Sequence, residues 1–133
     1  MPDKKAKVKK EKPEKEKVIT KNYAIAKHQY AKSSPDKIRR VVDLIRGKRS
    51  DEALAILRYL PQKGARLIEK VVKSAVANAN IIKLDKDNLI ISKAFVDQAS
   101  IYRRYRHRAR GRADVRKKKL SHITVCVAEG GIK

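Results

Sequence analysis

The amino-acid sequence predicts an α+β protein with a single folded domain. Its 133 residues leave room for one modest hydrophobic core. Three successive segments between residues 35 and 80 carry apolar residues at helical spacing, which predicts three helices. Two segments rich in β-branched residues follow, at residues 89–101 and 120–128, and predict a pair of strands. A strongly basic stretch separates these strands, so we expect a hairpin with a long basic connection.

A short strand is expected before the helices, over "YAIAKHQYA" (residues 23–31), where apolar and polar residues alternate weakly. Residues 1–20 are predicted to form a disordered basic tail, because residues 3–17 are mainly Lys and Glu and cannot bury enough apolar surface. Such a tail either solubilises the protein or settles on a polyanion. Residues 21–129 are expected to form the domain, and residues 130–133 a C-terminal tail.

The first helix is predicted within "SSPDKIRRVVDLIRGK". Ser34 is a candidate N-cap, Pro35 fits the first helical position, and Gly47 supplies the stop signal. One face of this helix is apolar and is expected to be buried: Ile38, Val41, Val42 and Ile45.

Two further helices are expected. The second begins at Ser50, carries two acidic residues in its first turn and ends at Pro61. Its predicted buried face consists of Ala53, Ile56, Leu57 and Leu60. The third covers roughly residues 65–80, with a buried face of Ile68, Val71, Val72, Ala75 and Ala79. The small residues on that face favour close packing against another element.

The last two strands are expected to pair antiparallel, because adjacent strands joined in sequence usually do so. The hairpin then covers about residues 89–128. In its second strand one set of side chains is predicted to face the core (Ile123, Val125, Val127) and the other to face outward (His122, Thr124, Cys126). If both sides of the long connection are extended, its end lies roughly 30 Å beyond the core.

Charge is concentrated in that connection. The chain has a formal net charge of +22, which predicts a polyanionic partner, and residues 103–119 alone hold ten Lys or Arg and one acid. Five arginines recur at a spacing of two from Arg104 to Arg112, so those on an extended strand point to one side, until a turn near Gly111 breaks the alternation. Arginine donates paired hydrogen bonds to phosphate, and the rings of Tyr102 and Tyr105 are suited to stacking on unpaired bases.

Nucleic-acid binding is therefore the predicted function of the basic stretch. Its candidate contacts are Arg103, Arg104, Arg106, Arg108, Arg110, Arg112, Arg116, Lys117, Lys118 and Lys119. A second basic group surrounds the first helix and avoids its apolar face: Lys32, Lys37, Arg39, Arg40, Arg46 and Lys48, followed by Arg49. A solvated run of charge without a specific ligand is the alternative interpretation.

Catalytic, metal and membrane functions are not expected. The three histidines are scattered without metal-ligand spacing, and no glycine-rich loop lies between a strand and a helix. Cys126 is the single cysteine, which fits a reducing compartment. The sequence has no signal-peptide pattern and no apolar run of about 18 residues. A soluble, intracellular protein without cofactor, metal or small-molecule substrate is expected.

Four stretches, in this order, resemble one protein family: "AKSSPDKIRRVVDLIRGK" (residues 31–48), "KSAVANAN" (73–80), "AFVDQA" (94–99) and "RARGRADVRKKKLSHITV" (108–125). They are similar to the L-twenty-two family of large-subunit ribosomal proteins, of the bacterial type. The resemblance extends from about Tyr23 to Glu129. It implies three helices packed on a small antiparallel sheet, with a long β-hairpin.

The resemblance also implies a function, that of a structural constituent of the large ribosomal subunit. The family's domain lies beside neighbouring subunit proteins, its hairpin penetrates 23S-type rRNA, and the hairpin tip lines the tunnel of the nascent polypeptide. Carried over, the tip lies at about residues 105–113 and exposes His107, Arg108, Ala109, Arg110, Gly111, Arg112 and Ala113. His107 stands where the family commonly has proline. A free-standing nucleic-acid-binding or RNA-chaperone-like protein is the alternative.

Overall fold

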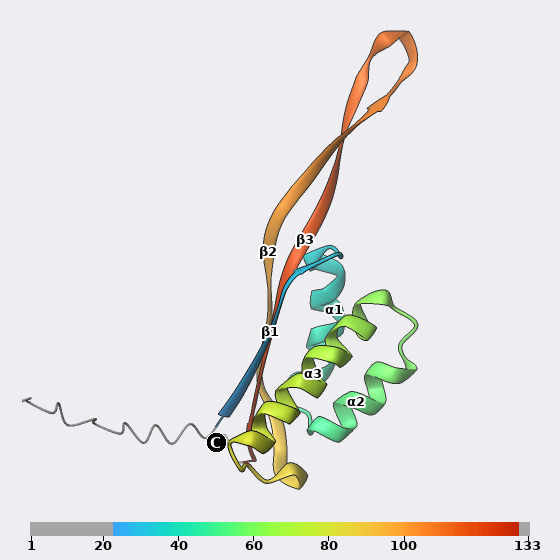
Figure 1. Ribbon diagram of the computed structural model, residues 1–133. Coiled ribbons are helices and arrows are strands. Elements are labelled where there is room, and N and C mark those ends of the chain that lie inside the picture. Colours follow the sequence, from blue (N-terminus) through green and yellow to red (C-terminus); the bar gives the residue numbers. More distant parts are fainter. Residues whose placement is uncertain (1–22, 131–133) are drawn as a thin grey trace, which may run out of the picture.

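In the computed structural model, which describes residues 23–130, one three-stranded antiparallel sheet is covered by helices on one side (Figure 1). Strands β1 (Tyr23–Ala31), β2 (Leu89–His107) and β3 (Ala113–Glu129) are arranged in the order β1-β3-β2. The helices are α1 (Pro35–Ile45), α2 (Ser50–Tyr59) and α3 (Lys63–Ile81). The predicted α+β class and antiparallel hairpin are confirmed.

The core lies between the helices and the covered face of the sheet. The predicted buried faces of α1 and α3 are confirmed, since every residue in them is buried. For the second helix the prediction was partly wrong: Ala53 and Leu57 are buried and the half-buried Leu60 packs against the core, but Ile56 is only half-buried and the unpredicted Leu54 packs against the core. The shift arises because α2 packs mainly on α3 and meets the sheet only at its margin.

Strand β3 is central, because both β1 and β2 pair with it. Because of this position, side chains on both faces of β3 are buried, whereas the sequence predicted burial on one face only. Ile123, Val125 and Val127 face the core as expected, but on the other face Thr124 is only 6% exposed and Cys126 only 8%. The neighbouring strands Tyr23–Ala31 and Leu89–His107 flank both residues, so the outer face of β3 is also largely covered.

The ends of α1 agree with two of the three predicted signals. Pro35 is the first helical residue, and Gly47 follows the helix with φ +76°, a conformation that favours glycine. Ser34 occupies the N-cap position, but its side chain makes no capping hydrogen bond to the backbone, so that part of the prediction was wrong. Its hydroxyl instead lies 3.4 Å from a carboxylate oxygen of Asp36.

Strands β2 and β3 continue far beyond the helices as a two-stranded arm (Figure 1). We define the arm as residues 102–119, all of which are exposed. Strand pairing persists up to His107 and Ala113, so the connection that separates the predicted strands is itself mostly strand. The turn lies between these two residues and contains Arg110 and Gly111, both with positive φ. The predicted turn near Gly111 is confirmed.

Two short segments connect these elements or close the arm: the 3-10 turns Lys86–Asn88 and Ala109–Gly111. The sheet narrows to two strands where β1 ends at Ala31. Irregular pairing occurs there on both sides of β3, between His28 and Ala31 in β1 and between Gln98 and Ile101 in β2. Both predicted tails lie outside the described residues, except for Gly130.

Candidate nucleic-acid interface

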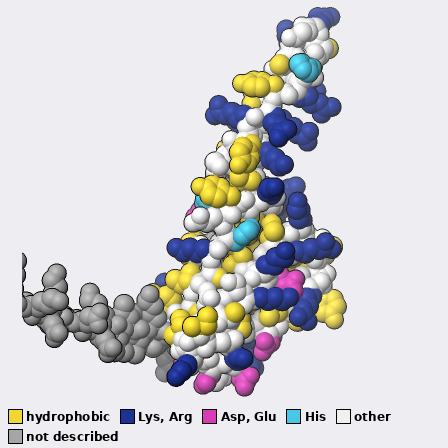
Figure 2. Space-filling model, in the orientation of Figure 1, with side chains coloured by type: hydrophobic (Ala, Val, Ile, Leu, Met, Phe, Trp, Pro, Cys, Tyr) yellow, Lys and Arg dark blue, Asp and Glu magenta, His cyan; other side chains and the backbone are white. Residues whose placement is uncertain are grey.

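The arm brings like charges directly opposite each other. In the β2–β3 ladder Arg103 is paired with Lys117, and Arg104 with Arg116. Like charges opposite each other across a strand pair are destabilising, and none of these four side chains has an ion-pair partner within residues 23–130. Figure 2 shows that Lys and Arg side chains are numerous along the whole arm. Anions supplied by a ligand would relieve the repulsion between them.

Both faces of the arm are suited to contact a nucleic acid. Side chains alternate along a strand, so Arg104 and Arg106 share one face while Tyr105 lies on the other, as predicted. Tyr102 lies on the arginine face and is 56% exposed, whereas Tyr105 is 74% exposed on the opposite face. Each face of the arm therefore carries an accessible aromatic ring beside basic side chains, including Arg103 on the Tyr105 face.

The tip of the arm is held by an ion pair that sequence reasoning did not anticipate. Nε of Arg108 donates to Oδ2 of Asp114 at 2.7 Å, and the backbone N–H of Arg108 donates to the carbonyl of Arg112 at 2.8 Å. Asp114 also stands opposite Arg106 in the ladder. The sequence could have pointed to this ion pair, because Asp114 is the single acid within the basic stretch.

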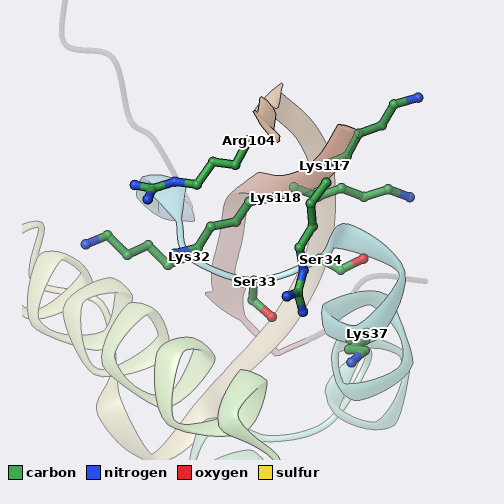
Figure 3. A pocket seen from close by; sticks show the side chains of 9 residues that line it. Lys32, Ser33, Ser34, Lys37, Arg104, Lys117 and Lys118 are labelled. Carbon is green, nitrogen blue, oxygen red and sulfur yellow. The ribbon is translucent and has the colours of Figure 1, made fainter. Parts of the chain in front are cut away.

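A concave space of about 720 Å³ lies at the base of the arm, which we call the notch. One wall comes from the β1–α1 connection and the start of α1, and the other comes from the arm (Figure 3). Seven basic side chains and two serines line it: Lys32, Ser33, Ser34, Lys37, Arg104, Arg116, Lys117, Lys118 and Lys119. The fold thus joins the two basic groups predicted separately, and Ser33 and Ser34 are additions to them.

One acid contacts the rim of the notch. Nζ of Lys119 lies 3.4 Å from Oδ2 of Asp36, across a sequence separation of 83 residues. This hydrogen bond and the charge of Lys119 hold the pKa of the Asp36 carboxyl below its usual value. Such a lowered pKa favours the folded state above the carboxyl's unfolded-state pKa, and the contribution disappears as the pH falls through the folded-state value.

Two of the arginines predicted on the first helix are engaged within the protein. Arg39 donates through Nε and Nη2 to the carbonyl of Val96 at 3.2 and 3.1 Å. Arg46 donates in the same way to the carbonyl of Ala94 at 3.2 and 2.7 Å. Each is also paired with an aspartate three residues earlier on α1. These arginines therefore attach α1 to strand β2, and their half-exposed guanidinium groups keep part of their surface available.

The remaining candidates on this side are exposed. Arg40 and Lys48 have no side-chain hydrogen bond or ion pair within the described part of the chain. Arg40 lines a smaller hollow beside the notch, together with Ser33, Lys37 and Lys63. Arg49 donates to the carbonyl of Asp87 at 2.6 Å, so its role is at least partly structural.

Replacing Arg46 with glutamine is expected to destabilise the domain by about 1–2 kcal/mol, because charge-assisted hydrogen bonds to a backbone carbonyl are lost at a half-exposed site. Arg40→Gln, on the same helix, is the matched control and should change the free energy of unfolding by less than about 0.5 kcal/mol. Urea denaturation of both variants measures the difference. Equal stabilities would show that the Arg46 bonds to Ala94 contribute nothing.

Other chemistry finds no support in the described residues. Residues 23–130 contain no cluster of three or more His, Cys, Asp or Glu side chains arranged to hold a metal ion. Burial raises the pKa of the Cys126 thiol, which disfavours a reactive thiolate. None of the helices in this part of the chain has the length and apolar character needed to cross a bilayer.

The sequence matches the family model described as "Ribosomal protein L22p/L17e" over residues 26–128. The chain belongs to this family. Bacterial relatives named "Large ribosomal subunit protein uL22" are similar to it: the one from Pelotomaculum thermopropionicum is 54% identical over 102 residues, covering 76% of this chain and 90% of the relative. The relative from Carboxydothermus hydrogenoformans is 53% identical over 107 residues, covering 80% and 93%.

Family membership confirms two expectations. The predicted resemblance to the bacterial L-twenty-two family was correct, and the match spans both walls of the notch and the whole arm. Because L22p/L17e proteins are structural ribosomal proteins, the chain is not an enzyme. A third relative, from Desulforamulus reducens, is 54% identical over 107 residues and covers 80% of this chain and 93% of its own.

Proposed function

We propose that this protein, a structural constituent of the large subunit of the cytoplasmic ribosome, binds 23S-type rRNA through its arm and notch. The observation that carries the proposal is the pairing of Arg103 with Lys117 and of Arg104 with Arg116 in an exposed ladder. Two strands that place cations opposite each other need anions close by, and RNA phosphates supply them at high density.

The distribution of charge favours an arm surrounded by RNA over one lying on a flat RNA surface. Basic side chains occupy both of its faces, and each face carries an exposed tyrosine, Tyr102 or Tyr105. A protein that touched RNA along one side would need basic residues on one face only. On the side of the molecule seen in Figure 2, most acidic side chains lie over the globular part, away from the tip.

In this proposal the tip lines the wall of the nascent-peptide tunnel. Residues 107–113 lie furthest from the core (Figure 1), and none of them is buried by the rest of the chain. The candidate lining side chains are those predicted from the sequence, with Arg110 and Gly111 at the apex of the turn. Neighbouring ribosomal proteins then meet the globular part, and the nascent polypeptide passes the tip.

Sedimentation tests whether the protein is associated with large ribosomal subunits in the cell. Cell lysate is separated on a sucrose gradient, and fractions are probed with an antibody against this protein. We expect it to follow the large-subunit and whole-ribosome peaks in constant ratio to the rRNA. Recovery mainly at the top of the gradient would instead indicate a free-standing nucleic-acid-binding protein.

Limited trypsin digestion tests the environment of the arm. In the free protein we expect the first cuts between Arg103 and Arg112 or in the Lys-rich segment of residues 1–20, because residues 103–112 have no buried side chain and both segments contain many trypsin sites. In intact large subunits the bonds between Arg103 and Arg112 should be protected. Mass spectrometry of the early fragments identifies the bonds. Equal cleavage rates in the two states would contradict an arm embedded in RNA.

A further inference from the structure

Helix α1 carries two aspartates in closely similar surroundings. Asp36 is paired with Arg39 at 3.3 Å and Asp43 with Arg46 at 3.1 Å, in both cases with the arginine three residues later. Both aspartate side chains are 60% exposed. They differ in one respect, since only Asp36 also contacts the arm, through Lys119 at 3.4 Å.

Asp36 accepts hydrogen bonds from two side chains that line the notch. Its Oδ2 atom accepts hydrogen bonds from the hydroxyl of Ser34 and from Nζ of Lys119, each at 3.4 Å. Both donors line the notch. An oxygen with a negative charge, held between a hydroxyl and an ammonium group, is in the position that a phosphate oxygen would take.

The carboxylate is a weak occupant of this position. The Asp36–Lys119 contact is long and partly exposed, with Lys119 43% exposed, and ion pairs of this kind contribute little to stability. Six further cations line the same notch without forming an ion pair within residues 23–130. A ligand that presents several phosphates therefore gains from many donors at once, whereas Asp36 satisfies only Ser34 and Lys119 besides its own Arg39.

We propose that the notch binds consecutive phosphates of one RNA strand, held from both walls, and that Asp36 is a built-in competitor that yields Lys119 and Ser34 to this strand. The proposal rests on the proposed function, because it assigns a position on the arm to the RNA. In the free protein Asp36 provides a weak contact between α1 and the base of the arm. It also lowers the affinity of the notch for ligands that bring only one or two charges.

The test compares Asp36→Asn with Asp43→Asn in the full chain. Both changes remove one negative charge and one ion pair with arginine on the same helix, so their effects on net charge are equal. Binding to protein-free large-subunit rRNA is measured by filter binding at several salt concentrations. We expect Asp36→Asn to bind about two- to fivefold more tightly than Asp43→Asn at low salt, the range of one exposed ion pair. Equal affinities would overturn the role of Asp36.

A second pair of variants isolates the contact itself. In a Lys119→Gln background the advantage of Asp36→Asn over Asp43→Asn should disappear, because the donor released by the change is no longer present. An advantage that persists in this background would show that Asp36 acts by its charge alone and would also overturn the proposal. Thermal unfolding of each variant confirms that the compared proteins are folded.

A third measurement distinguishes binding of an RNA strand in the notch from binding of a free phosphate ion. Sodium phosphate should displace rRNA from the wild-type protein no better than sodium chloride of equal ionic strength, since one small ion contacts only a few of the seven cations that line the notch and cannot replace consecutive phosphates of a strand. Much stronger displacement by phosphate would assign the notch to a free ion. If instead the wild type showed no salt-dependent rRNA binding, the proposed function itself would fail, which distinguishes the two results.

Discussion

Removal of the arm is expected to lower rRNA affinity by orders of magnitude while the domain stays folded. Tyr102 and Lys118 stand directly opposite each other in the ladder. A two-residue Asn-Gly turn that replaces residues 103–117 therefore connects two strand ends that are already paired. The change deletes eight of the ten Lys and Arg in the basic stretch. Filter binding to protein-free large-subunit rRNA compares this variant with the full chain.

The size of the effect follows from counterion release. Each phosphate neutralised on a duplex contributes about −0.9 to the slope of log K against log salt concentration, and somewhat less on a single strand. If half of the ten basic residues contact phosphate, the full chain should show a slope of roughly −4 or steeper. Between 50 and 200 mM salt the affinity then falls roughly 10²- to 10³-fold. A slope near −1 for the full chain would contradict an arm that anchors the protein electrostatically.

The same variant tests whether the arm contributes to folding. Every residue from 102 to 119 is exposed, and the core cluster comes from the helices and the lower parts of the strands. Cooperative thermal unfolding should therefore persist, and stability should rise slightly because two like-charged cross-strand pairs are removed. A broad transition without cooperativity would show that the arm supports the core.

The second large effect is expected in the central strand. Ile123 on β3 is fully buried beneath the helices. Replacing it with alanine removes buried methylene and methyl groups and leaves a cavity between well-packed elements, which costs about 2–5 kcal/mol. For a domain of this size the melting temperature should fall by roughly 10 °C or more. Differential scanning calorimetry gives the midpoint and tests whether the transition stays two-state.

Ile81→Ala is the matched control, because the chemical change is identical and Ile81 is 80% exposed at the end of α3. Its effect should stay within about 0.5 kcal/mol. Similar losses of stability in the two variants would mean that burial of Ile123 is not what stabilises the sheet against the helices.

Local patterns in the sequence were sufficient for the helices and for the existence of the hairpin. The stripe from Ile38 to Ile45 repeats at helical spacing, and Pro35 and Gly47 lie at positions where the backbone geometry admits few alternatives. The charge of the basic stretch was equally visible, because it depends on composition alone. The family resemblance rests on the same local stretches, and the family match confirms it.

Contacts between distant parts of the chain were decided only by the tertiary structure. Strand β3 is central because it pairs with two strands, one of which lies far away in sequence. The hydrogen bond from Arg46 to the carbonyl of Ala94 and the contact between Asp36 and Lys119 also join residues that are far apart in sequence. The pattern of one segment carries no information about which segment lies beside it. Periodicity therefore predicted the buried faces of α1 and α3, whereas the burial of Thr124 and Cys126 depends on the strands beside β3. The notch likewise exists only because the fold places the start of α1 against the base of the arm.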